Sequence, residues 1–223
     1  PRTVFVDLEP STIDAIQSGT FGRLLKADCF IHGVSGAGNN WAKGHYTEGA
    51  ELCDSFMDFV RRLAETSETL QGFQMVHSVG GGTGGGMGTL VIENIREEFP
   101  DKVASTFSVI GTCNSEAVVE IYNVVLSLRH LVDYSDITTL IDNRKLYEIC
   151  FRELSLQDIS YQTLNKLISS SMSEVTCSLR FPDHRRCHNL RNFASELVSF
   201  PRMHFLMNGF TPLHENQSHG PPL

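Results

Sequence analysis

The strongest chemical signal in the sequence is a run of glycines between Gly80 and Gly88. Seven of the chain's 18 glycines fall within these nine positions, between a strand-like and a helix-like segment. A backbone without Cβ atoms can turn tightly and direct N–H groups at a phosphate, and a following helix N-terminus adds partial positive charge. Thr83 contributes a hydroxyl. The pattern predicts a phosphate-binding loop, since a flexible hinge would need neither the strand nor the helix.

This run lacks the Lys-Ser or Lys-Thr of a Walker motif. A GxGxxG pattern is present at Gly80, Gly82 and Gly85, but it means little among so many glycines. The nearest Lys or Arg, Arg96, is a couple of helical turns away, so we expect Mg²⁺ to balance the phosphate charge. Asp7 or Glu9, at the end of the first predicted strand, could hold the ion. Glu9 could equally lie beside a helix N-cap.

A second loop of small residues, 33–40, precedes another helix-like segment. Asn39 and Asn40 could supply amides to a second phosphate contact. An ordinary turn explains the same composition equally well.

Strand-like and helix-like segments alternate along the chain, which predicts an α/β fold with a doubly wound, mainly parallel sheet. Ligands bind such sheets at the carboxyl ends of the strands. The predicted strands are 3–8, 28–32, 74–78, 103–110, 137–141 and 203–207. The predicted helices are 10–18, 46–66, 89–98, 116–132, 143–153, 159–175 and 189–198.

The composition excludes several classes of protein. The 223 residues carry 18 basic and 26 acidic side chains, a net charge of −8, which disfavours binding to nucleic acid or an anionic membrane. No apolar run approaches the roughly 20 residues needed to span a bilayer. Six widely spaced cysteines without a signal peptide predict reduced thiols in the cytoplasm.

Histidines and cysteines give no strong catalytic pattern. His45, His77, His130 and His204 are scattered, so no Ser/His/Asp set can be assembled from spacing. Metal-ligand spacing occurs in the segment 184–188 (His-Arg-Arg-Cys-His), but its two arginines would repel a cation. Solvated loop residues are the simpler interpretation.

Several motifs together resemble the tubulin family. Residues 80–89 are similar to its glycine-rich loop, with Gly85 where the family usually has Ser, and residues 36–49 resemble β rather than α chains. Shorter matches occur at residues 6–10, 141–143, 179–182 and 200–205, so that the resemblance covers nearly the whole chain.

The resemblance implies a GTP/GDP site with Mg²⁺. It assigns Mg²⁺ to Glu9, a second-loop contact to Asn39, the ribose to Glu116, and the ring stacking to Tyr161. The phosphates would be held by Ser78, Gly82, Thr83 and Gly84. The guanine edge would be read by Asn143 and Asn165, whose amides can both donate and accept. No catalytic residue is assigned.

The resemblance also implies a domain organisation. Residues 1–158 would form a GTP-binding domain lacking its first strand and loop, 159–180 a connecting core helix, and 181–223 an incomplete intermediate domain. Because the first strand is central in the doubly wound order, its absence would leave a gap in the sheet. Because hydrolysis in this family is completed across the subunit contact, the chain alone would not be an efficient GTPase. Asn192 stands where the family places a Glu in α chains and a Lys in β chains, so the chain would not activate its neighbour's site either.

The predicted function is that of a β-tubulin-like structural subunit of microtubules in the cytoplasmic cytoskeleton. It would pair with α-tubulin in a heterodimer and bind GTP at the longitudinal subunit contact of the microtubule lattice, with no nucleic-acid or membrane partner. A truncated, non-assembling fragment with weak or no GTP binding is the alternative, favoured by Gly85, Asn192 and altered loop lengths. A dinucleotide-dependent oxidoreductase is disfavoured, because its glycine loop would follow the first strand.

Overall fold

The computed structural model describes residues 2–111, 118–154, 156, 158–181 and 189–209. In this part of the chain the strands form two parallel sheets. The smaller sheet pairs β1 (Phe5–Asp7) with β2 (Phe30–His32). The larger has the order β3-β4-β5-β6, formed by Gly72–Ser78, Val103–Ile110, Ile137–Asp142 and Phe205–Met207. The parallel pairing confirms the predicted α/β class.

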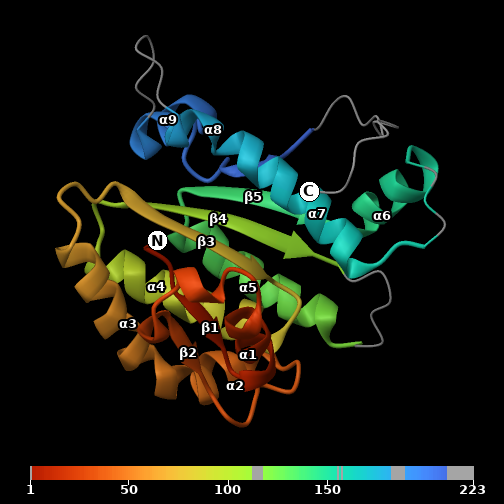
Figure 1. Ribbon diagram of the computed structural model, residues 1–223. Helices are drawn as coiled ribbons and strands as arrows, with labels where there is room; N and C mark the ends of the chain where they lie inside the picture. The colour runs from red at the N-terminus through yellow and green to blue at the C-terminus, as the bar shows by residue number, and fades with distance from the viewer. Residues whose placement is uncertain (1, 112–117, 155, 157, 182–188, 210–223) are drawn as a thin grey trace.

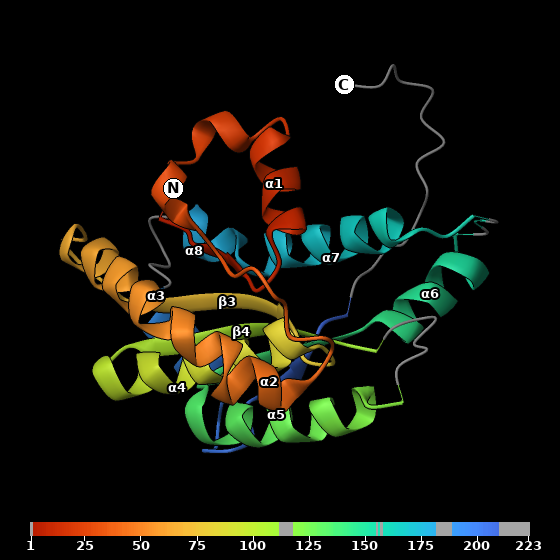
Figure 2. The same cartoon turned by 90° about the horizontal axis from the view of Figure 1, so that it is seen from below.

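Helices cover both faces of the larger sheet (Figures 1 and 2). The α-helices are α1 Pro10–Ser18, α2 Trp41–Tyr46, α3 Glu48–Glu65, α4 Gly88–Glu98, α5 Glu120–Tyr134, α6 Asn143–Arg152, α7 Tyr161–Val175, α8 Cys177–Arg180 and α9 Leu190–Leu197. On one face, Ile92 of α4 and Leu131 of α5 are buried in one cluster. On the other, Ile168 of α7 packs with Phe107 of β4 and Ile141 of β5. Short 3₁₀ turns, η1 Gly22–Leu24 and η2 Ala27–Cys29, precede β2.

The helix α3 illustrates how hydrophobic spacing builds the core. Cys53, Phe56, Met57 and Val60 recur at helical spacing and are all buried. They share a cluster with Val91 and other residues of α4, and Val4 and Val6 of the first strand segment pack against it. The apolar layer of α3 and α4 therefore lies beneath both sheets.

Most predicted elements are found within a few residues of their predicted bounds. The main difference is α2, which begins five residues before the predicted helix 46–66; Asn40 caps it by accepting hydrogen bonds from the backbone N–H groups of Ala42 and Lys43. Helix α4 is preceded by a six-residue π-helical segment, η3 (Gly82–Met87), within the predicted loop.

The two sheets are separated by a cleft of about 880 Å³ between β1 and β3. Its walls include Val6 and Met75, and its floor includes Val60 of α3 and Val91 of α4. Within the described residues β1 pairs only with β2, and β3 only with β4. This interruption confirms the expected gap in the sheet.

Candidate functional site

The glycine run is a helical turn rather than an open loop. Gly80 and Gly81 follow β3, and η3 then continues directly into α4. A side chain would not fit in this turn: a Cβ on Gly82 would overlap the Cβ of Ala37, and one on Gly86 would overlap the carbonyl oxygen of Trp41. Close backbone packing therefore requires these glycines. The predicted helix 89–98 matches α4 to within one residue, but the helical backbone begins earlier, at Gly82.

Thr83 connects the glycine turn to the end of β1. Its hydroxyl donates a hydrogen bond to Oδ1 of Asp7 at 3.1 Å. Gly84 lies directly against the backbone of Ser78, where a Cβ would overlap the Ser78 carbonyl oxygen. Three of the residues assigned to the phosphates, Ser78, Thr83 and Gly84, therefore lie together, and Gly82 adjoins them in the chain.

Behind the turn, His77 of β3 is buried and holds Gly84. Its Nδ1 lies 2.7 Å from the Gly84 carbonyl oxygen, and its Nε2 lies 2.8 Å from Oγ of Ser108. Since a carbonyl oxygen only accepts, Nδ1 carries the proton and Nε2 accepts from the serine hydroxyl. Burial lowers the pKa of His77, although its hydrogen bond to Gly84 opposes this effect. A neutral imidazole thus fixes the backbone of the turn.

The second loop reaches the same place from β2. The backbone N–H of Gly33 donates to the Asp7 carbonyl oxygen, and that of Gly36 donates to Leu8. Gly36 has a φ of +65°, and a Cβ there would meet the carboxylate of Glu9. Asn39 also adopts a positive φ, 56°, and its side-chain Oδ1 lies near Gly81. Glu9 and Asn39 therefore join the phosphate-side residues, whereas Asn40 caps α2.

The residues present fit a magnesium ion at the end of β1. Glu9 occupies the N-cap position of α1 but makes no side-chain capping hydrogen bond. The oxygen ligands available there are the carboxylates of Asp7 and Glu9 and the hydroxyl of Thr83. Mg²⁺ prefers such oxygen ligands and is commonly shared between one or two carboxylates and phosphate oxygens.

The predicted base end of the site lies along the same sheet edge. Ser78 is in register with Val109 of β4, and Ile110 with Asp142 at the end of β5. Two strand spacings, roughly 10 Å in all, therefore separate Ser78 from Asp142. Asn143 follows directly as the first residue of α6 and is buried, while Asp142 caps this helix by accepting from the Arg144 N–H.

The remaining assigned residues lie on helices α7 and α9 or outside the described part of the chain. Tyr161 and Asn165 lie one turn apart near the start of α7, both exposed, and Figure 1 shows this end of α7 beside α6. Asn192 is exposed on α9. Glu116 and the segment 184–188 lie outside the described residues.

Helix α5 carries residues that the sequence interpretation missed. The side-chain amide of Asn123 donates to the carbonyl oxygens of both Asn39 and Gly80, each at 2.9 Å. Glu120 is buried one turn earlier, where a Cβ on Gly80 would meet its side chain. A polar residue recurring on one face of an otherwise apolar helix was the available sequence signal, but spacing could not identify the partners.

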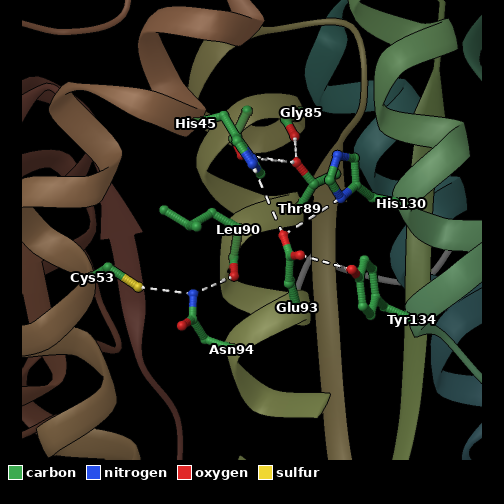
Figure 3. A network of polar contacts seen from close by, with 10 residues as sticks. His45, Cys53, Gly85, Thr89, Leu90, Glu93, Asn94, His130 and Tyr134 are labelled. Atoms are coloured by element: carbon green, nitrogen blue, oxygen red, sulfur yellow. Dashed lines mark hydrogen bonds and ion pairs between the residues drawn. The ribbon is translucent and has the colours of Figure 1, made fainter. Parts of the chain in front are cut away.

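Two of the scattered histidines meet below the glycine turn (Figure 3). His45 of α2 and His130 of α5 lie with ring centroids 4.9 Å apart. Both face Glu93 of α4, at 4.0 and 3.7 Å, and Glu93 accepts a 2.7 Å hydrogen bond from Tyr134. Burial, reinforced by His45, lowers the pKa of His130. Thr89 joins this network to the glycine turn. Its Oγ1 lies 3.3 Å from Nδ1 of His45 and donates to the carbonyl oxygens of Gly85 and Gly86, so the network supports the turn.

The described residues contain neither a cluster of metal-ligating side chains nor a membrane-spanning helix. No group of three or more His, Cys, Asp or Glu side chains there is arranged to hold a metal ion. None of the described helices has the length and apolar character required to cross a bilayer.

Comparison with known proteins gives one family. Residues 1–151 match the Tubulin/FtsZ family, GTPase domain. The chain is 57% identical over 220 residues to the "Tubulin beta-1 chain" of Hypocrea rufa, covering 98% of this chain and 49% of that protein. It is 56% identical over 220 residues to the "Tubulin beta chain" of Pneumocystis carinii, covering 98% and 50%. The chain thus spans about half the length of the curated relatives it matches.

Proposed function

Because the chain belongs to the Tubulin/FtsZ family, we propose that it acts as a β-tubulin-like subunit that binds GTP or GDP with Mg²⁺. The observation that carries this proposal is the convergence of Asp7, Glu9, Asn39 and Thr83 beside the glycine turn. Asn143 lies farther along the same edge. A nucleotide laid along the carboxyl ends of β3, β4 and β5 would meet phosphate ligands first and base ligands last.

In this arrangement each group has a distinct task. The backbone of Gly82 and Gly84 and the hydroxyls of Ser78 and Thr83 would bind the phosphates, and Glu9 would hold Mg²⁺. At the base end Asn143 and Asn165 would hydrogen-bond guanine, with Tyr161 stacking on the ring and Glu116 near the ribose. We assign the nucleotide domain to residues 1–158, the connecting helix to 159–180 and the next domain to 181–223.

The partner we propose is α-tubulin, with the nucleotide at the longitudinal contact of a microtubule in the cytoplasm. Hydrolysis would depend on the neighbouring subunit, and Asn192 provides neither an acid nor a cation to the next site. The interrupted sheet favours a second candidate function, a non-assembling form of this fold with weak or no GTP binding.

The nucleotide site is tested by titrating the full chain with a fluorescent GTP analogue and Mg²⁺. Thr83→Ala removes the hydroxyl beside Asp7 and is expected to weaken binding about tenfold or more. Thr176→Ala is the matched control, because its hydroxyl hydrogen-bonds Met172 near the end of α7. If wild type is folded but shows no saturable binding, the GTP site is rejected. If Thr83→Ala and Thr176→Ala bind the analogue with equal affinity, the phosphates lie elsewhere.

Assembly is tested separately by co-sedimentation with polymerising α/β-tubulin. Incorporation of the chain into the pellet, in proportion to polymer, supports the subunit role. A chain that binds GTP but stays in the supernatant supports the non-assembling form.

A further inference from the structure

Asn123 joins the two loops that form the phosphate side of the site. It lies on α5 and is 4% exposed. Its Nδ2 donates to the Asn39 carbonyl oxygen of the second loop and to the Gly80 carbonyl oxygen of the glycine turn, both at 2.9 Å. Its Oδ1 accepts from the backbone N–H of Trp41 at 3.2 Å. Both amide protons and the amide oxygen are thus engaged in three backbone contacts.

These contacts matter because the two loops come from opposite sides of the sheet interruption. The second loop follows β2, and the glycine turn follows β3, with no ladder between β1 and β3 in the described residues. Sheet hydrogen bonds therefore do not set the distance between them. Asn123 connects them directly through a rigid planar amide, and Thr83 connects the turn to Asp7.

Further hydrogen bonds fix the backbone around Asn123. Ser127, one helical turn later, is fully buried and donates to the carbonyl oxygens of Val79 and Asn123. Asn39 adopts a left-handed conformation, φ 56°, which is unfavourable for residues other than Gly although Asn tolerates it best. The hydrogen bond from Asn123 fixes the carbonyl oxygen of this strained residue.

We propose that Asn123 is a positioning residue that sets the separation of the two loops and thereby the affinity for polyphosphate. The inference rests on the proposed GTP site. A polyphosphate must meet N–H groups from both loops at once, so a change in their separation weakens phosphate contacts. Contacts to the base, located around Asn143 and α7, do not depend on that separation.

The variant Asn123→Asp keeps the shape of the side chain and its contact with Trp41. It replaces two N–H donors with an acceptor that faces two carbonyl oxygens. The matched control is Asn94→Asp on α4, which removes an amide that donates to the Leu90 carbonyl oxygen at 2.8 Å and to Sγ of Cys53 (Figure 3). Among the described residues, the side-chain amide of Asn94 donates to Leu90 and Cys53 and to neither phosphate loop.

The affinities of both variants and of wild type are measured for GTP, GMP and guanosine, together with urea unfolding. Asn123→Asp is expected to weaken GTP binding about tenfold or more while guanosine affinity changes by less than about twofold. Asn94→Asp is expected to leave both affinities near wild type. Equal losses for GTP and guanosine, or no loss for GTP, would overturn the positioning role. Failure of wild type to bind GTP rejects the proposed function itself.

A measurement on the wild-type chain covers the case in which Asn123→Asp does not fold. The side-chain amide protons of Asn123 are expected to exchange slowly with solvent and to shift in NMR spectra on addition of GTP. Those of Asn94 should not shift. An Asn123 amide whose signals are unchanged by saturating GTP contradicts the inference.

Discussion

The His77→Asn variant tests whether a neutral, buried imidazole fixes the glycine turn. The amide of Asn can still donate to the Gly84 carbonyl oxygen but cannot reach Ser108, whose hydroxyl proton then becomes available to Thr106 Oγ1 at 3.3 Å. One buried hydrogen bond and part of the ring volume are lost. We therefore expect the free energy of unfolding at pH 7.5 to fall by about 1–2 kcal/mol.

The sign of the pH effect follows from the lowered pKa of His77. Below the unfolded-state pKa, about 6.5, the unfolded chain binds a proton at this residue that the folded chain does not. Wild type therefore loses stability as the pH falls below that value. Between pH 7.5 and 5.5 the contribution of one such histidine reaches at most about 1.4 kcal/mol, and the variant lacks it.

The assay is urea unfolding of wild type and variants at pH 7.5 and 5.5. His77→Asn should narrow the difference in stability between the two pH values, whereas Ser108→Ala should lower stability by about 1 kcal/mol at both. Identical pH dependence in wild type and His77→Asn would refute the neutral, buried histidine.

Two further stability predictions can be measured in the same way. Gly85→Ser is expected to destabilise the fold by about 1–3 kcal/mol, because its Cβ would lie 2.7 Å from the Val79 carbonyl oxygen and 2.8 Å from Oγ of Ser127; unchanged stability would show that the turn relaxes freely. Tyr134→Phe removes the hydrogen bond to Glu93 and should cost about 1 kcal/mol, and no loss would show that Glu93 is fully solvated in wild type.

Local pattern was sufficient to predict much of the fold. The strand Val103–Ile110 has the predicted bounds because a buried apolar run between turn residues has few alternatives. The sequence did not predict α2 as a separate helix, because its six residues include Gly44 and no clear apolar stripe. It is stabilised instead by the Asn40 cap and by close packing of Gly44 on Gly82, contacts that local pattern does not reveal.

The candidate site, like the fold, could be predicted from the sequence only in part. Glycine content predicted where the turn would be, but not that it would be helical, because the helix depends on backbone from distant segments such as Trp41. Thr83 could be selected from its place in the motif. Asn123 could not, since its acceptors lie 84 and 43 residues away and nothing in an isolated helical segment identifies them.

The interruption of the sheet changes what must hold the site together. In a continuous sheet, hydrogen bonds between neighbouring strands would fix the carboxyl ends of β1 and β3 relative to each other. Here the polar joining contacts are side chains, Thr83 to Asp7 and Asn123 to both loops, above the apolar layer of α3 and α4. Close packing of the glycine turn against Ala37 and Trp41 adds to them. Affinity for polyphosphate should therefore be more sensitive to these few polar side chains than to the packing of β4 and β5.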